Sequence, residues 1–313
     1  MVFEAGRFPK VLAYVTAYQD EQSLRVCLDS IAKQVLPVTH ILVVDNSPLP
    51  LLLPMQYNEL VVIHCPENIG VGGGVTLALQ QAINQGYDFV WLLDQDSQPD
   101  VMCLQHLAQV YQEQHCIEAP IAMVAPLVID GVMDRIIGGA VFDRYRFKEY
   151  LPNWDTALWV ECDAPIISGI LIAIAAVKVA GLPQQELFMD GIDLEYGFRL
   201  KQHNFRNIIA SRAILHHCLG NPLKVLFLGK PYFIQNYSIP RSYYYHRNHT
   251  HLEMLFSESK YKPWTFLWRC YIVAKDLLLT LLYRDQKSSR ISACLIGTWH
   301  GFLGRIRKLE RSS

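Results

Sequence analysis

Two aspartates in the turn Asp94-Gln95-Asp96 have the residue type and spacing to hold a divalent metal ion. They follow the apolar run Phe89–Leu93, which is typical of a strand buried on both faces. Carboxylates one residue apart on such a turn can point to one side, and Mg²⁺ or Mn²⁺ prefers a few carboxylates together with phosphate oxygens. A cation held there would neutralise a diphosphate leaving group. The competing interpretation is a solvated acidic turn, and an isolated Asp-x-Asp pair does not decide between the two.

A second acidic group lies about a hundred residues later, in Asp190–His203, where acids come first and bases later along an expected helix. Asp193 and Glu195 are two residues apart, so on a helix they point in different directions. One of them could act as a general base toward a sugar hydroxyl. The alternative is that they only stabilise the helix dipole. The histidines His216 and His217 follow, and because they are adjacent, at most one of them can face a given site. A lone histidine is more often a packed or surface residue than a metal ligand.

Asp45 and the segment Asn68–Gly74 (NIGVGGG) are weaker candidates for binding a nucleotide. Asp45 could accept a hydrogen bond from a base or ribose, or could bond its own backbone in a turn. The glycine-rich segment is expected to be a loop before a helix over Val75–Asn84, where backbone N–H groups could approach a phosphate. Its glycines are too closely spaced for the dinucleotide-binding fingerprint.

Strands that alternate with helices over the first 125 residues must position these groups. Helices are expected after Asp20, over Val75–Asn84 and over about 100–114, and strands at Val11–Ala17, His40–Val44, Leu60–His64, Phe89–Leu93 and Ile121–Ala125. This alternation predicts a doubly wound, mostly parallel sheet. In such sheets ligands bind at the carboxyl ends of the strands. Four polar or glycine-rich clusters are therefore expected on one rim: Thr16–Tyr18, Asp45–Ser47, Asn68–Gly74 and Asp94–Asp96.

Charge is unevenly distributed along the chain. The net charge of the 313 residues is −1, which gives no sign of a nucleic-acid partner. From Lys260 onward, eleven bases face three acids, so this tail carries +8 and the preceding residues −9. The aromatic and basic residues of Trp264–Leu282 recur at helical spacing, which fits a helix on an anionic membrane surface. Packing on the catalytic domain and a homo-oligomer contact remain alternatives.

Features of export and membrane insertion are not found in the sequence. No stretch approaches the ~18–20 uninterrupted apolar residues of a membrane-spanning helix, and the N-terminus does not read as a signal peptide. The eight cysteines are scattered without a Cys-x-x-Cys pair, which is typical of buried structural thiols in a reducing cytosol. We therefore expect a cytoplasmic protein, in peripheral contact with the inner face of the cell membrane if the tail binds lipid.

The motifs together resemble the family 2 glycosyltransferases of the GT-A fold, and among them the bacterial rhamnosyltransferases of O-antigen and other surface polysaccharides. The resemblance covers nearly the whole chain. It rests on Thr16-Ala17-Tyr18, VVDNS at 43–47, ENIGVGGGVTLAL at 67–79, DFVWLLDQDSQPD at 88–100, ISGILIA at 167–173, GLPQQELFMDGIDLEYGFRL at 181–200, HHCLG at 216–220 and YYYHRN at 243–248. One departure is Tyr196-Gly197-Phe198-Arg199, where relatives often have Trp-Cys-Leu-Arg.

The resemblance implies a role for each matching residue. Asp193 corresponds to the catalytic base, and Asp94, Asp96 and His217 to contacts of a Mg²⁺ or Mn²⁺ ion. Arg247 is expected to reach the diphosphate from a mobile segment. The remaining donor-binding residues are Thr16, Tyr18, Asp45, Asn68, Gly70, Asp94 and Gln95.

The resemblance also implies a GT-A catalytic domain over 1–255, with a nucleotide-sugar half (1–125) and an acceptor half (126–255), followed by a basic, amphipathic helical tail over 256–313. The expected reaction is inverting transfer of L-rhamnose from dTDP-L-rhamnose onto a saccharide or lipid-linked saccharide. The alternatives are a glycosyltransferase that uses another UDP- or GDP-linked sugar, and a non-catalytic sugar-nucleotide-binding protein on the same fold. A sugar-nucleotide pyrophosphorylase is disfavoured, because Val11–Asp20 lacks the glycine-rich, basic loop of that class.

Overall fold

The computed structural model describes residues 9–52, 57, 59–154, 157–218, 220, 222–227 and 230–307. By its internal contacts the chain divides into two units. Unit 1 contains the described residues of Met1–Val141, Glu149–Gln185 and Ile192–His217, and unit 2 those of Phe142–Lys148, Glu186–Gly191 and Cys218–Ser313. The catalytic domain expected over 1–255 therefore spans both units, and residue 255 lies near the end of a helix inside unit 2.

The first half of unit 1 alternates strands and helices as the sequence predicts. Its elements are β1 (Val11–Ala17), α1 (Glu21–Ala32), β2 (His40–Asp45), β3 (Leu60–His64), α2 (Gly70–Gln85), β4 (Phe89–Asp94), β5 (Gln98–Pro99), α3 (Cys103–Gln114) and β6 (Ile121–Asp130). The carboxylate of Asp20 caps α1 by accepting a hydrogen bond from the N–H of Ser23, at 3.0 Å. This is the N-cap interaction that the sequence predicts for an aspartate in this position.

The elements between residues 131 and 217 are less regular. It contains β7 (Arg135–Ile137), β8 (Gly139–Asp143), β9 (Arg146–Tyr150), β10 (Trp159–Cys162), β11 (Leu171–Ala173), α4 (Ile174–Ala180), the 3-10 turn Gln185–Leu187, α5 (Ile192–Gln202) and β12 (Arg206–His217). Strands β8 and β9 form a separate two-stranded sheet.

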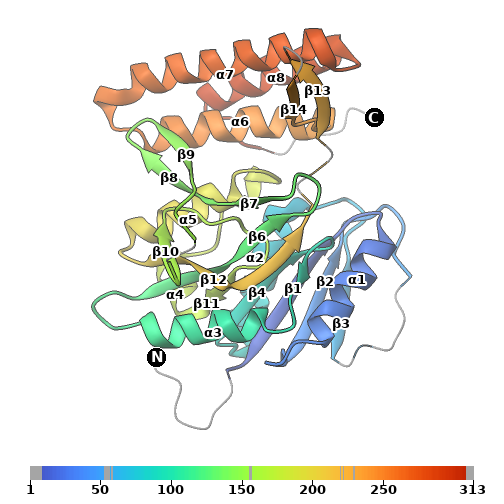
Figure 1. Cartoon of the computed structure of the whole chain (residues 1–313), viewed down its shortest axis with the longest axis vertical. Helices are drawn as coiled ribbons and strands as arrows, with labels where there is room; N and C mark the ends of the chain where they lie inside the picture. Colours follow the sequence, from blue (N-terminus) through green and yellow to red (C-terminus); the bar gives the residue numbers. More distant parts are fainter. Residues whose placement is uncertain are drawn as a thin grey trace. The chain divides into compact units, whose positions relative to one another are not determined.

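Ten strands of the described residues form one mostly parallel sheet with the central order β10-β12-β6-β11-β4-β1-β2-β3 (Figure 1). Strand β1 runs parallel to both β2 and β4, and β12 runs parallel to β6. The short β11 lies antiparallel between β4 and β6. The central strands are buried on both faces, which explains why Val11–Val15 and Phe89–Leu93 are continuous apolar runs.

The glycine-rich segment is helical, which differs from the loop expected over Asn68–Gly74. Helix α2 begins at Gly70 and therefore includes Gly72, Gly73 and Gly74. A Cβ atom on Gly74 would lie 2.1 Å from the hydroxyl oxygen of Tyr14 on β1, and one on Gly72 would lie 3.0 Å from the carbonyl oxygen of Gln185. The glycines thus allow α2 to pack against its neighbours more closely than any larger residue would.

Unit 2 is built around three helices. Helices α6 (Ile239–Phe256), α7 (Lys262–Tyr283) and α8 (Lys287–Phe302) accompany the hairpin of β13 (Leu223–Phe227) and β14 (Lys230–Ile234), with a 3-10 turn at Ser259–Tyr261 (Figure 1). Helix α8 packs on α6 through Gly297 and Gly301, where an added Cβ would lie 2.5 Å from a backbone carbonyl of α6.

The helices and cysteines bear on two of the sequence predictions. In the described residues there is no helix with both the length and the apolarity needed to cross a bilayer. All eight cysteines are free thiols, and five of them, Cys27, Cys65, Cys103, Cys162 and Cys294, are buried. Burial of small apolar thiols is the structural role that their scattered positions indicate.

Candidate active site at the carboxyl edge of the sheet

The carboxyl ends of β1, β2 and β4 meet at one edge of the sheet, as the sequence predicts. Thr16 is paired with Asp94 across β1 and β4, and Ala17 with Asp45 across β1 and β2. The Gln95 side chain ties two of the loops together, since its oxygen accepts a hydrogen bond from the N–H of Tyr18 at 2.7 Å and its nitrogen donates to the Tyr18 carbonyl at 3.2 Å. These clusters of polar residues therefore lie on one rim.

The loop after β2 is fixed by its own side chains. The buried carboxylate of Asp45 accepts hydrogen bonds from the N–H groups of Ser47 and Leu51, at 2.9 and 2.8 Å. Asn46 accepts one from the N–H of Ile69 at 2.9 Å, which joins this loop to the start of α2. Asp45 thus has the turn role that the sequence left open, and a contact of Asp45 with a ribose stays a prediction.

The segment before α2 is held by Asn68. This residue adopts a left-handed conformation with φ of 52°, which asparagine tolerates better than most residues. Its side-chain oxygen accepts a hydrogen bond from the N–H of Gly70 at 2.9 Å. Asn68 and Gly70 therefore shape the N-terminal turn of α2, beside the loop of Asp45.

Asp94, Asp96 and His217 converge on one point of this edge. Each offers one ligand atom, and these atoms all lie within 4.8 Å of one another. His217 Nδ1 lies 3.2 Å from Asp96 Oδ1, and His217 Nε2 lies 4.0 Å from Asp94 Oδ2. Two carboxylates and an imidazole form a donor set that suits a divalent cation such as Mn²⁺ or Mg²⁺.

The tertiary structure brings His217 to Asp96 through a strand pairing. Strand β12 is unusually long, and its register against β6 shifts between Ala210 and Ile214. Beyond that irregularity it also pairs with β5, where His216 is opposite Gln98, and β5 follows the Asp94-Gln95-Asp96 turn directly. His216 points elsewhere, with its Nε2 3.5 Å from Asp100 Oδ1. Of the two adjacent histidines, His217 is therefore the one at the acidic turn.

The electrostatics of this cluster favour a positive charge. Burial by itself would lower the pKa of the His217 imidazole, but a hydrogen bond with Asp96 and the negative charges of Asp94, Asp96 and Asp130 outweigh it and raise the pKa. The concentration of carboxylates that favours a proton on His217 would equally favour a bound cation. The residues present thus fit a divalent metal ion.

Ser168 is a member of the site that the sequence did not assign. Its buried hydroxyl donates a hydrogen bond to Asp94 Oδ2, while the Asp94 N–H donates to the hydroxyl of Ser97 at 3.1 Å. Gly169 follows with φ of 86°, and its carbonyl accepts a hydrogen bond from the Trp91 indole at 3.0 Å. In the sequence, the Ser-Gly pair between two apolar segments indicates a turn, but it does not indicate that the serine contacts Asp94.

The two acidic residues of α5, Asp193 and Glu195, lie in different environments. Glu195 is buried and accepts hydrogen bonds from Arg199 Nε at 2.6 Å and from the N–H of Gln184 at 3.2 Å. Asp193 is half-buried in the first turn of α5, and its Oδ1 accepts a hydrogen bond from the N–H of Leu194 at 2.9 Å. Glu195 is therefore committed to a structural ion pair, and a role of Asp193 as general base stays a prediction.

Gly197 explains the departure of this helix from the pattern of its relatives. A Cβ atom at this position would lie 2.8 Å from both the Cα of Ala164 and the carbonyl oxygen of Asp163. The side chain of Asn207 donates hydrogen bonds to the carbonyls of Gly197 and Asp163, each at 2.8 Å. The glycine thus fixes α5 closely against the 163–164 segment.

Arg247 belongs to unit 2, where it is fully buried on α6. Its guanidinium donates hydrogen bonds to the carbonyls of Glu186, Leu187 and Arg307, at 2.8, 3.2 and 2.7 Å. These contacts give it a structural role on a regular helix rather than in the expected mobile segment. A contact of Arg247 with a diphosphate stays a prediction.

Comparison with known proteins finds similarity to sugar-transfer enzymes. The glycosyl transferase family 2 model matches residues 13–145. Galactofuranosyltransferase GlfT1 of Mycobacterium tuberculosis is 25% identical over 236 residues, which cover 70% of this chain and 74% of that protein. GlfT1 of Mycolicibacterium smegmatis is 25% identical over 240 residues, covering 70% and 75%.

Solved structures share the fold. A crystal structure of GalNAc-T7 with UDP, GalNAc and Mn²⁺ superposes with a TM-score of 0.59 at 13% identity, covering 92% of this chain and 55% of that one. This chain thus spans little more than half of that protein. Staphylococcus aureus TarS 1–349 in complex with UDP-GlcNAc superposes with a TM-score of 0.53 at 17% identity, covering 91% and 79%. At these identities the likeness shows a common GT-A fold.

Proposed function

We propose that the chain is a family 2 glycosyltransferase, the family whose model matches residues 13–145, and that it moves a sugar from a nucleotide-sugar donor to a saccharide acceptor with inversion. The observation that carries this proposal is the convergence of Asp94, Asp96 and His217 on one point at the carboxyl edge of the sheet. Ligands of open α/β sheets bind at this edge.

Different residues of unit 1 would assist the departure of the leaving group and the attack of the nucleophile. Asp94, Asp96 and His217 would hold Mg²⁺ or Mn²⁺, which when bound supplies positive charge for the departing diphosphate. Ser168 orients the Asp94 carboxylate through its hydrogen bond. Thr16, Tyr18 and Gln95 line the same edge, where they would border the nucleotide.

Asp193 would serve as the general base for the acceptor. Its carboxylate takes the proton from the attacking hydroxyl as that oxygen forms a bond to the anomeric carbon and the bond to the diphosphate breaks. A single displacement of this kind inverts the anomeric configuration. Positioned general bases contribute about 10²–10⁴-fold to a rate, and the remaining acceleration comes from positioning and from stabilisation of the leaving group.

For the donor we propose dTDP-L-rhamnose, which the motifs of the chain favour. The main rival is a UDP-linked sugar, since the two GlfT1 relatives are named galactofuranosyltransferases and the TarS structure holds UDP-GlcNAc. For the acceptor we propose a saccharide or lipid-linked saccharide of surface polysaccharide synthesis. The reaction would then take place in the cytoplasm, at the inner face of the cell membrane.

Thermal unfolding of the chain with a panel of nucleotide sugars, with and without Mn²⁺, tests the donor. A ligand that binds the folded state raises the apparent stability by about 2.7 kcal/mol at a hundred times its dissociation constant. We expect the largest shift with dTDP-L-rhamnose and Mn²⁺ together. A larger shift with a UDP-linked sugar would assign that sugar as the donor in place of dTDP-L-rhamnose. No shift with any sugar nucleotide would contradict the proposal.

Donor hydrolysis distinguishes an enzyme from a non-catalytic binding protein of the same fold. We expect the preferred sugar nucleotide to be hydrolysed slowly in the absence of acceptor, and hydrolysis to stop when a chelator removes divalent ions. Tight binding without any hydrolysis or transfer would favour the non-catalytic alternative. Activity that the chelator leaves unchanged would contradict a role for a metal ion.

A further inference from the structure

The buried face of helix α7 in unit 2 is polar. The buried residues of this helix are Thr265, Arg269 and Thr280. The Arg269 guanidinium donates to the hydroxyl of Thr250 at 3.0 Å and lies 3.5 Å from a carboxylate oxygen of Glu253, both on α6. A helix on a globular protein normally turns its apolar face inward, so this orientation is the reverse of the usual one.

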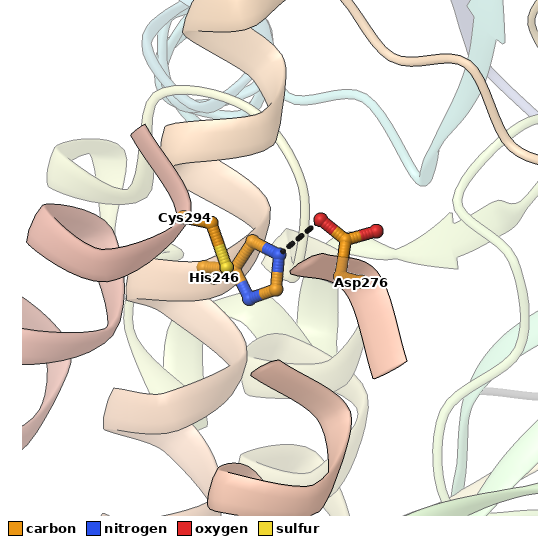
Figure 2. A group of neighbouring side chains, drawn as sticks. All are labelled: His246, Asp276 and Cys294. Atoms are coloured by element: carbon orange, nitrogen blue, oxygen red, sulfur yellow. Dashed lines mark hydrogen bonds and ion pairs between the residues drawn. The ribbon is translucent and has the colours of Figure 1, made fainter. Parts of the chain in front are cut away.

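A second polar group joins α7 to both neighbouring helices (Figure 2). His246 of α6 lies 3.2 Å from Asp276 of α7 through its Nε2, Cys294 of α8 lies beside them, and Arg284 donates to the other Asp276 oxygen at 2.8 Å. The three residues in Figure 2 have the types that ligate zinc. Asp276, however, is already neutralised by Arg284, and a cation here would be repelled by Arg284 and by Arg269. This group is therefore a polar core that fixes the inner face of α7.

The apolar side chains of α7 and α8 lie on the outside. Each of ten large apolar residues exposes 46–60% of its surface: Trp264, Phe266, Leu267, Tyr271, Leu278, Leu281, Leu282, Leu295, Ile296 and Trp299. Most of those on α7 follow one stripe at spacings of three and four residues. The rings of Phe266 on α7 and Phe302 on α8 are 5.2 Å apart, so the two helices contribute to one surface. We call this surface the outer face.

The charges around the outer face are almost all positive. On α7 the exposed charged residues are Lys262 and Lys275 alone. Over residues 258–307 the exposed bases are Lys260, Lys262, Lys275, Lys287, Arg305 and Arg307, against the exposed acids Glu258, which pairs with Lys260 at 2.9 Å, and Asp285. Such a pattern is complementary to a negatively charged partner. A symmetric contact with a second copy would instead bring like charges together.

We propose that the outer face of α7 and α8 is a membrane-docking surface that lies flat in the headgroup region of an anionic lipid bilayer. The helix α7 has 22 residues and, at 1.5 Å per residue, is about 33 Å long. Apolar residues enter the acyl boundary while lysines contact anionic headgroups. Tryptophan and tyrosine are the residues favoured at this interface. The inference rests on the proposed function and deepens it by naming a lipid surface as a partner, which suits a lipid-linked saccharide among the proposed acceptors. Its evidence lies in unit 2 alone.

Vesicle flotation of the full chain tests the docking surface. The vesicles contain phosphatidylcholine and phosphatidylglycerol in roughly equal amounts, or phosphatidylcholine alone. The test variant is Leu278→Glu with Trp299→Glu, two exposed positions of the outer face. The matched control is Ile117→Glu with Val179→Glu, which places the same charges on exposed apolar positions of unit 1. Circular dichroism and thermal unfolding check that every variant is folded.

The expected result is that the wild type and the control float with the mixed vesicles, and that the outer-face variant binds them at least tenfold more weakly. Replacing Lys262 and Lys275 by glutamate should also weaken binding about tenfold or more, since each base near an anionic surface contributes about 1 kcal/mol. Equal flotation on phosphatidylcholine alone would overturn the anionic-lipid assignment.

Three further results would overturn the proposal. These are a wild type that stays in the soluble fraction, an outer-face variant that floats as well as the wild type, and a wild-type dimer that this variant converts to monomers without any flotation. The last result would assign the outer face to a second copy of the chain. Donor hydrolysis measured in parallel, without vesicles, separates failure of this proposal from failure of the proposed function.

Discussion

Replacing Asp193 by asparagine removes the proposed base while it preserves the size and the hydrogen-bonding shape of the side chain. Asp193 is half-buried in the first turn of α5, and the loss of its charge near the helix N-terminus should cost about 0.3–1 kcal/mol. The transfer rate should fall about 10²–10⁴-fold, the contribution of a positioned general base. The neighbouring Glu195 cannot compensate, because Arg199 and the N–H of Gln184 already bind its carboxylate.

Glu195→Gln is the matched control, since it removes a carboxylate two residues away on the same helix. Breaking a buried ion pair costs about 3–5 kcal/mol, and we expect the lower end because the Arg199 side chain keeps 23% of its surface exposed. The assay measures initial transfer rates at saturating donor, together with the free energy of unfolding in urea and the thermal shift with donor. Asp193→Asn should lose the rate and keep both stability and donor binding. An active Asp193→Asn enzyme would refute the assignment of the base.

Three other predictions concern the metal, the packing of α2 and the pH dependence of stability. Asp96→Asn removes a carboxylate oxygen of the proposed metal site, so the stabilisation of the folded chain by Mn²⁺, measured by thermal shift, should largely disappear. An unchanged shift would exclude Asp96 as a ligand. Gly74→Ala brings a Cβ atom to 2.1 Å from the Tyr14 hydroxyl and should lower the free energy of unfolding by about 1–3 kcal/mol through overpacking. In a Tyr14→Phe background this cost should fall below about 1 kcal/mol, because the hydroxyl is gone and alanine favours the helix. Equal costs in the two backgrounds, measured by urea unfolding, would contradict this contact. Burial lowers the pKa of His246 below its usual 6.5, so the unfolded chain binds the proton more readily and stability is lost as the pH falls from about 7 to 5. The free energy of unfolding of His246→Gln should therefore depend less steeply on pH than that of the wild type. Identical slopes would show that His246 does not change its protonation on unfolding.

The fold of the first 125 residues could be predicted because its signals are local. Continuous apolar runs identify β1 and β4, and Asp20 caps α1 through a residue three positions away. The exception is α2. Its glycines look like a loop in the sequence, and only the approach of Tyr14 and Gln185 shows why a helix needs them.

The sequence also determined the types of residue at the candidate site and the edge on which they lie. Because parallel strands carry their carboxyl ends to one side, Thr16, Asp45 and Asp94 had to meet there once the alternation was recognised. The sequence likewise showed that Asp193 and Glu195 must diverge, since helical geometry separates residues two apart.

Only the tertiary structure decided which of these groups touch. His217 reaches Asp96 because β12 shifts register and then pairs with β5, and Ser168 binds Asp94 across 74 positions of the chain. The orientation of α7 was also beyond the sequence, which left a membrane surface, packing on the catalytic domain and a homo-oligomer contact open for this segment. Buried partners for Arg269 and Asp276 on other helices turn the apolar stripe of α7 outward. Local patterns fix which face of a helix is apolar, whereas long-range contacts fix which face is buried.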